Sequence, residues 1–154
     1  QKEINAEKVE LKDVAEEVKD SLAGIADRKK IAVTVEGDGC VFMEREHAVE
    51  LVKNLVENGI RYGNDGGYVK VKISHAIGET VLSVEDNGIG IEEKHLGRIC
   101  ERFYRVNKSR SRESGGTGLG LAIVKHICVL YSADLDISSV YGVGTTVTVK
   151  IKTA

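Results

Sequence analysis

The sequence predicts an α+β fold, a two-layer α/β sandwich in which three main helices cover a mixed sheet of about five strands. Three long segments carry apolar residues at steps of three and four positions, the spacing of amphipathic helices. Shorter segments between them alternate apolar and polar residues or are rich in β-branched residues, which is typical of strands. The chain has 154 residues, which is the size of one domain, so 1–154 is predicted to fold as a single unit.

The order of the elements follows from these patterns. Main helices are expected at 11–25, about 44–62 and 119–131, with a short helix near 92–100. Strands are expected at 31–35, 69–73 and 80–85, and two closing strands around 135–137 and 147–151. Glycine-rich turns separate them. A polar segment at about 102–117 has neither pattern, and we expect it to form a mobile lid.

The composition excludes several classes of function. The 22 basic and 24 acidic side chains give a formal charge of −2, so no strong non-specific binding to nucleic acid is expected. No apolar run approaches the roughly 18–20 residues of a membrane span. Three widely separated cysteines argue against a disulfide framework and suit a reducing compartment. The first residue is Gln rather than Met, so we expect the chain to be a piece of a longer protein.

Two glycine-rich segments indicate a site for phosphate groups. Residues 86–90 follow a predicted strand, and residues 115–120 open a predicted helix. Glycine allows backbone N–H groups to approach a phosphate closely, and a helix N-terminus adds positive potential. Neither segment has the spacing of a P-loop or of a Rossmann fingerprint. Each alone would fit an ordinary turn, but the two together favour a nucleotide.

Three polar side chains add to this site. Asp86 ends a strand, where a carboxylate can accept a hydrogen bond from the N6 amino group of adenine; the alternative is a turn-capping Asp. Asn54 and Asn58 are four residues apart and share one helical face. A side-chain carbonyl oxygen suits Mg²⁺, although a pair of solvent-facing asparagines is the plainer interpretation.

Five segments, in this order and at these spacings, resemble the conserved motifs of sensor histidine kinases. Residues 54–62 resemble the N box, 86–90 the first glycine box, 101–105 the F box and 116–121 the second glycine box. Residues 141–146 resemble the closing strand pair. The resemblance covers about 9–151 and implies the Bergerat fold of the GHKL superfamily. It is closest to the catalytic and ATP-binding domain of kinases like the phosphate-regulon sensors.

This resemblance implies a protein-histidine kinase that uses ATP and Mg²⁺. The γ-phosphoryl group would pass to a histidine on a separate dimerisation domain and then to an aspartate on the receiver domain of a response regulator. Asn54 and Arg105 are the implied catalytic residues, and Asn58 is the implied Mg²⁺ ligand. The other implied nucleotide-binding residues are Arg61, Tyr62, Asp86, Gly88, Gly90, Gly116, Thr117, Gly118, Leu119, Gly120 and Thr145. The lid would be 102–117.

Two features bear on the type of reaction. In the ATPase branches of the superfamily a glutamate lies four residues before the metal-binding asparagine and acts as the base for water. Here that position is Asn54, which cannot act as a base. Glu57 comes one residue before Asn58, so its side chain points about 100° away from that of Asn58 around the helix axis. The chain contains no proline, so it lacks the H-E/D-x-x-x-P motif of the acceptor histidine.

Two other functions are considered beside the kinase. One is an anti-sigma-type serine kinase of the same superfamily, and the other is a non-catalytic nucleotide-binding docking module. For the kinase, the domain is expected to lie in the cytoplasm and to be monomeric by itself. The parent protein is then expected to be a homodimer anchored in the cell membrane.

Overall fold

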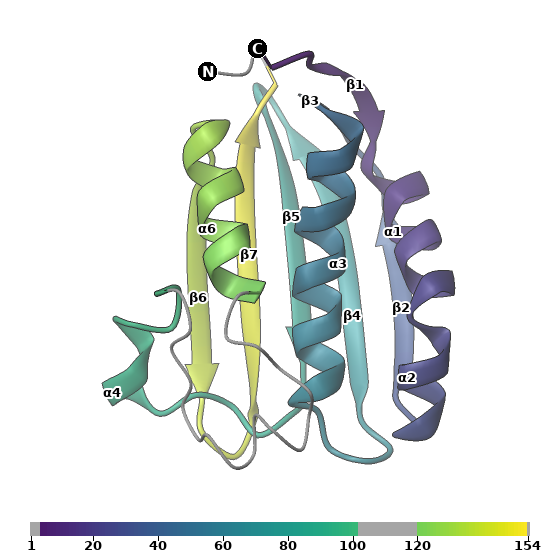
Figure 1. The fold of residues 1–154 in the computed structure, drawn as a ribbon, viewed down its shortest axis with the longest axis vertical. Coiled ribbons are helices and arrows are strands. Elements are labelled where there is room, and N and C mark those ends of the chain that lie inside the picture. Colours follow the sequence, from purple (N-terminus) through teal and green to yellow (C-terminus); the bar gives the residue numbers. More distant parts are fainter. Residues whose placement is uncertain (1–3, 102–119, 154) are drawn as a thin grey trace.

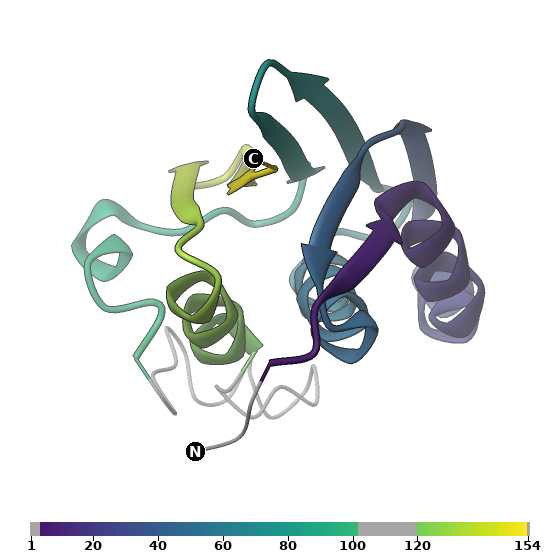
Figure 2. The same cartoon turned by 90° about the horizontal axis from the view of Figure 1, so that it is seen from above.

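The structure, a computed structural model, describes residues 4–101 and 120–153. Its helices lie on one face of a five-stranded sheet, so the predicted two layers are present (Figure 1 and Figure 2). The strands of this sheet are β2 (Ala32–Gly37), β4 (Tyr68–Ala76), β5 (Glu79–Asp86), β6 (Asp134–Val140) and β7 (Gly144–Lys152). The helices are α1 (Leu11–Ser21), α2 (Ala23–Arg28), α3 (Arg45–Arg61), α4 (Glu93–Leu96) and α6 (Gly120–Leu130).

The sheet is mixed, as predicted. Its strand order is β2-β4-β5-β7-β6. The pair β2–β4 is parallel because α3 makes the crossover between these strands, whereas the other three pairs are antiparallel. The prediction of an α+β two-layer fold with a mixed sheet is therefore confirmed.

The core lies between the helices and the inner face of the sheet. The apolar stripe predicted for α3 is buried, with Leu51, Val52, Leu55 and Val56 at 3% exposure or less. In the central strands every second residue points inward, so β4 and β5 each bury one apolar face. The opposite face of the sheet carries mostly polar side chains and has no helix over it in the described residues (Figure 2).

Two sequence predictions about the elements are wrong. The single helix expected at 11–25 is divided at Leu22 into α1 and α2. The Ser21 hydroxyl donates to the Val18 carbonyl at 2.9 Å, and Gly24 is a poor helix former, so both disfavour a continuous helix. The helix expected near 92–100 spans only Glu93–Leu96.

The sequence analysis also missed a small second sheet. The strands β1 (Glu7–Glu10) and β3 (Cys40–Met43) pair antiparallel, with Val9 opposite Val41. Each strand has four residues, too short for a reliable alternation, and the two are far apart in sequence. This pair lies at the top of Figure 1, beside the start of β5.

The elements that carry the predicted site end at the opposite end of the sheet. The strand β5 ends at Asp86, which pairs with Thr145 near the start of β7. The helix α3 ends at Arg61, and the next carbonyl, of Tyr62, accepts the Ile89 N–H at 3.1 Å. Segments far apart in the sequence therefore meet at one end of the molecule (Figure 1). Within the described residues, no helix has the length and apolarity needed to cross a membrane.

Candidate functional site

The segment 86–90 forms a tight loop at the end of β5. The Asp86 carboxylate accepts the Gly88 N–H at 2.9 Å, which closes a turn of the kind that an Asp side chain makes with its own backbone. The turn-capping role considered for Asp86 is therefore present. It occupies Oδ1, and a carboxylate has further acceptor sites on both of its oxygens.

The Asp86 carboxyl has a raised pKa. Its half-burial raises the pKa by penalising the charged form, and the nearby Glu85 carboxylate adds to this. Hydrogen bonds from the backbone of Gly88 and Thr145 oppose the shift without cancelling it. A half-buried acceptor at a strand end, with an unfavourable desolvation energy, is typical of a group that binds a ligand.

Two glycines of this loop are required by close backbone contacts. A methyl group on Gly88 would lie 2.4 Å from the Tyr62 carbonyl oxygen. Gly90 has φ +75°, and a methyl group there would lie 2.3 Å from the Val140 carbonyl oxygen. Both glycines are therefore explained by packing of the loop against the end of α3 and the β6–β7 hairpin, whether or not a ligand is bound.

The end of α3 lies beside this loop. Arg61 and Tyr62, both partly buried, follow each other at the last helical position and the C-cap. The Arg61 Nε donates to the Glu57 carboxylate at 2.9 Å, one turn earlier on α3. This contact also orients Glu57 toward Arg61.

The two asparagines of α3 face the N-terminus of α6. The Asn54 Nδ2 donates to the Glu50 carbonyl at 2.7 Å, and this bond does not use its Oδ1. A methyl group on Gly120 would lie 3.2 Å from the Asn58 Oδ1 and 3.5 Å from the Asn54 Oδ1. The N box and the last glycine of the second glycine box thus lie side by side. Two hard oxygen ligands beside a helix N-terminus fit a site for Mg²⁺ and a polyphosphate.

Thr145 lies in β7, where it pairs with Asp86 of β5. Its hydroxyl is 2.8 Å from the Ser139 Oγ, which also accepts the Ile91 N–H at 2.7 Å and lies 2.9 Å from the Gly144 carbonyl oxygen. Ser139 therefore joins the end of the glycine loop to the β6–β7 hairpin. The sequence analysis missed it, since a serine in a polar strand carries no distinguishing signal.

Asn87 is a second residue that the sequence analysis missed. Its Oδ1 accepts the Tyr68 N–H at 2.8 Å, and its carbonyl accepts the Asn64 Nδ2 at 3.3 Å. These bonds fix the loop to the start of β4. Its place between Asp86 and Gly88 was the only signal that could have suggested a role.

The structure thus brings all of the predicted residues that it describes into two neighbouring groups. Asn54, Asn58 and Gly120 form one group, and Arg61, Tyr62, Asp86, Gly88, Gly90 and Thr145 form a neighbouring one. Arg105, Gly116, Thr117, Gly118, Leu119 and the lid expected at 102–117 lie outside the described residues.

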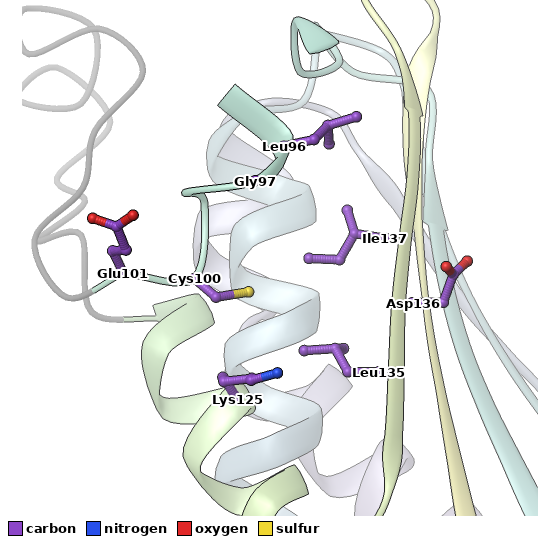
Figure 3. Close-up of a pocket in the computed structure, with 8 residues that line it drawn as sticks. All are labelled: Leu96, Gly97, Cys100, Glu101, Lys125, Leu135, Asp136 and Ile137. Carbon is purple, nitrogen blue, oxygen red and sulfur yellow. The ribbon is translucent and has the colours of Figure 1, made fainter. Parts of the chain in front are cut away.

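A separate cavity of about 420 Å³ lies between α4, α6 and β6 (Figure 3). Leu135 and Ile137 extend from β6 toward Cys100 and Lys125, whereas Asp136 points to the other side of the strand (Figure 3). Leu96, Gly97 and Glu101 complete the lining. Burial raises the pKa of the Cys100 thiol, so it is a weak nucleophile. None of the predicted site residues that the structure describes lines this cavity.

A comparison with known families decides the identity of the fold. The family described as histidine kinase-, DNA gyrase B-, and HSP90-like ATPase matches residues 43–154. The chain belongs to this family. The family and fold predicted from the motifs are therefore confirmed.

Curated relatives narrow the branch to sensor histidine kinases. The chain is 50% identical over 95 residues to the phosphate regulon sensor protein PhoR of Pseudomonas aeruginosa, an alignment that covers 62% of the chain and 21% of that protein. It is 33% identical over 148 residues to the sensor histidine kinase YkoH of Bacillus subtilis, covering 96% of the chain and 32% of that kinase. The chain thus spans about a fifth to a third of the length of these relatives.

Solved structures agree with the fold. The mycobacterial sensor histidine kinase MprB superposes with a TM-score of 0.80 at 24% identity, covering 96% of this chain and 97% of that one. Full-length ShkA, in complex with AMPPNP, superposes with a TM-score of 0.83 at 21% identity, covering 99% of this chain and 32% of that one.

Proposed function

We propose that the chain is the part of a sensor histidine kinase that binds ATP with Mg²⁺ and transfers the γ-phosphoryl group to a histidine on a separate dimerisation domain. The observation that supports it most is the meeting of three elements at one end of the fold. Asp86 ends β5, the Asn54 and Asn58 oxygens face Gly120, and the glycine loop lies against the end of α3.

In this site different residues bind different parts of the nucleotide. Asp86 accepts a hydrogen bond from the adenine N6 amino group, which favours adenine over guanine because guanine has a carbonyl there. Tyr62 and Thr145 lie beside the base, and Arg61 lies toward the phosphates. Asn58 holds Mg²⁺, which neutralises charge on the phosphates during transfer. Asn54 and the segment 116–120 contact the phosphates, and Arg105 stabilises charge on the transferred group.

The kinase reaction is favoured over hydrolysis by the residues of α3. The position that would carry a hydrolytic base holds Asn54, and an amide does not accept a proton at neutral pH. Glu57, the nearest carboxylate along the helix, is bound to Arg61 at 2.9 Å. A histidine imidazole needs no such base because it is itself the nucleophile.

The two alternatives are not favoured. The curated relatives are sensor histidine kinases rather than anti-sigma-type serine kinases. The match to a family of ATPases over 43–154 argues against a docking module without catalysis.

The parent protein supplies the rest of the reaction. A dimerisation domain provides the acceptor histidine, and the receiver domain of a response regulator takes the phosphoryl group from it. We place the chain in the cytoplasm and the parent homodimer at the cell membrane.

The test is phosphotransfer from ATP·Mg²⁺ to an added histidine-containing dimerisation domain of a relative. Asn58→Ala should abolish transfer, while Lys53→Ala, an exposed change on the same helix, should leave it intact. Transfer that survives Asn58→Ala would refute the metal role. ATP hydrolysis by the chain alone should be very slow, and turnover near 1 s⁻¹ or faster, the range of competent enzymes, would favour an ATPase.

A further inference from the structure

The ammonium group of Lys29 lies at the C-terminal end of α3. Its Nζ donates to the carbonyl oxygens of Ile60 at 3.0 Å, Arg61 at 2.7 Å and Gly63 at 3.0 Å. An ammonium carries three N–H donors, and three carbonyls accept here. Lys29 follows α2, about 30 residues before these partners.

The next carbonyl in this series belongs to Tyr62 and has a different partner. It accepts the N–H of Ile89, in the middle of the glycine loop, at 3.1 Å. The Cα of Gly88 is held so close to the same oxygen that a methyl group there would lie at 2.4 Å. Three carbonyls around Tyr62 are therefore bonded to Lys29, and the Tyr62 carbonyl itself is bonded to the glycine loop.

The backbone of Lys29 is also tied to the loop after α3. Its carbonyl accepts the Gly66 N–H at 2.9 Å. On the other side, Asn64 of the same α3–β4 loop and Tyr68, the first residue of β4, are bonded to Asn87. Lys29 and the glycine loop thus hold the end of α3 from two sides.

We propose that Lys29 is a positioning residue for nucleotide binding: by holding the last turn of α3, it sets the Tyr62 carbonyl and through it the glycine loop that carries Asp86. The inference rests on the proposed function, because it assigns to that loop the binding of adenine.

The physical basis is the set of acceptors that every helix leaves unpaired at its C-terminus. The Ile60 carbonyl also accepts the Gly63 N–H at 3.1 Å, so loss of the ammonium removes one of its two donors, and removes this donor from the Arg61 and Gly63 carbonyls as well, which favours fraying of the last turn. A cation at this end also interacts favourably with the negative end of the helix dipole. Loss of the ammonium should therefore loosen the peptide units on both sides of Tyr62 while the rest of α3 stays buried.

The experiment uses the 154-residue chain, with ADP·Mg²⁺ as the probe in a calorimetric titration well below the unfolding temperature. Lys29→Met keeps the length of the side chain and removes the donors. Lys30→Met is the matched control at the exposed neighbouring residue. Ile151→Val, a change in the buried core of β7, controls for a general loss of stability. Amide hydrogen exchange is followed at Ile89 and, as an internal reference, at Leu82.

Lys29→Met is expected to weaken ADP binding about tenfold, the lower end of what is lost when a group that orients metal ligands is removed. The Ile89 amide should exchange faster in this variant, while the Leu82 amide should not. Both control variants should bind ADP like the unchanged protein. If Lys29→Met does not fold, Lys29→Gln, which keeps two donors, should show a smaller loss of ADP affinity with the same faster exchange at Ile89.

A folded Lys29 variant that binds ADP like the unchanged protein, or one in which the exchange at Ile89 is unaltered, would overturn the proposal. If the unchanged protein binds no ADP, the proposed function fails instead. The exchange at Ile89 then still decides whether Lys29 sets the loop.

Discussion

The two ends of the central strand β5 differ in how far their polar side chains are satisfied by hydrogen bonds within the protein. At its start, Thr80 is 1% exposed and its hydroxyl donates to the Cys40 carbonyl at 2.7 Å. At its end, the half-buried Asp86 accepts hydrogen bonds and still has acceptor capacity left over. One end is internally satisfied, and the other is arranged for a ligand.

Two carboxylates near these ends show the same contrast. Beside Cys40, hydrogen bonds from its thiol and from the Gly39 N–H lower the pKa of the Glu10 carboxyl. At the other end, burial raises the pKa of the Asp86 carboxyl. Ionised Glu10 therefore contributes to stability, whereas ionised Asp86 reduces it. A functional site that reduces stability is a common trade-off.

The largest effect is expected from Asp86→Asn. If Asp86 binds adenine as proposed, the substitution replaces the charged acceptor of the N6 amino group by a neutral amide, whose N–H₂ group would repel that donor. ATP affinity should fall at least about a hundredfold, or about 2.7 kcal/mol. Calorimetric titration measures it, with Asp65→Asn in the exposed α3–β4 loop as control. Undiminished affinity in the Asp86 variant would refute the adenine assignment.

Gly88→Ala should come next, because its methyl group would lie 2.4 Å from the Tyr62 carbonyl oxygen. The forced shift should cost about 1–3 kcal/mol of unfolding free energy and should also weaken ATP binding. Chemical denaturation measures the first effect. Gly24→Ala, at a helical position with nothing within 4 Å, is the control and should be neutral or stabilising. A Gly88 variant as stable as the unchanged protein would contradict the tight contact.

Thr80→Val tests the other end of β5. The isosteric change leaves the Cys40 carbonyl without its donor and should lower the unfolding free energy by about 1–2 kcal/mol. ATP affinity, measured on the same sample, should be unchanged. A loss of affinity would show that the two ends of the strand are coupled and do not have separate roles.

The smallest effect is expected from Glu10→Gln, and it depends on pH. Since the pKa of Glu10 is lowered in the fold, its contribution is complete above the ordinary pKa and is lost as the pH falls through the folded value. The variant should therefore be slightly less stable at pH 7 and equally stable in strong acid. Denaturation at both pH values checks this, with the exposed Glu7→Gln as control. A difference that persists in acid would exclude the ionic origin.

The sequence predicted the long elements better than the small ones. The stripes of α3 and the alternation in β4 and β5 are long enough to be read directly, and they place Asn58 and Asp86. The pair β1–β3 has four residues in each strand and depends on contacts between distant segments, so no local pattern reveals it. Lys29 and Ser139 act through backbone carbonyls and amides, which any polar residue could contact, so only the three-dimensional structure identifies them.

The contrast between the two ends of β5 is tested most directly by the thermal unfolding midpoint of the unchanged protein and of Asp86→Asn, each with and without ATP·Mg²⁺ at pH 7. Without nucleotide the variant should unfold at the higher temperature, because it no longer buries a charge. With nucleotide only the unchanged protein should be stabilised. A variant that unfolds earlier without ATP, or that ATP stabilises to the same extent, would contradict the account.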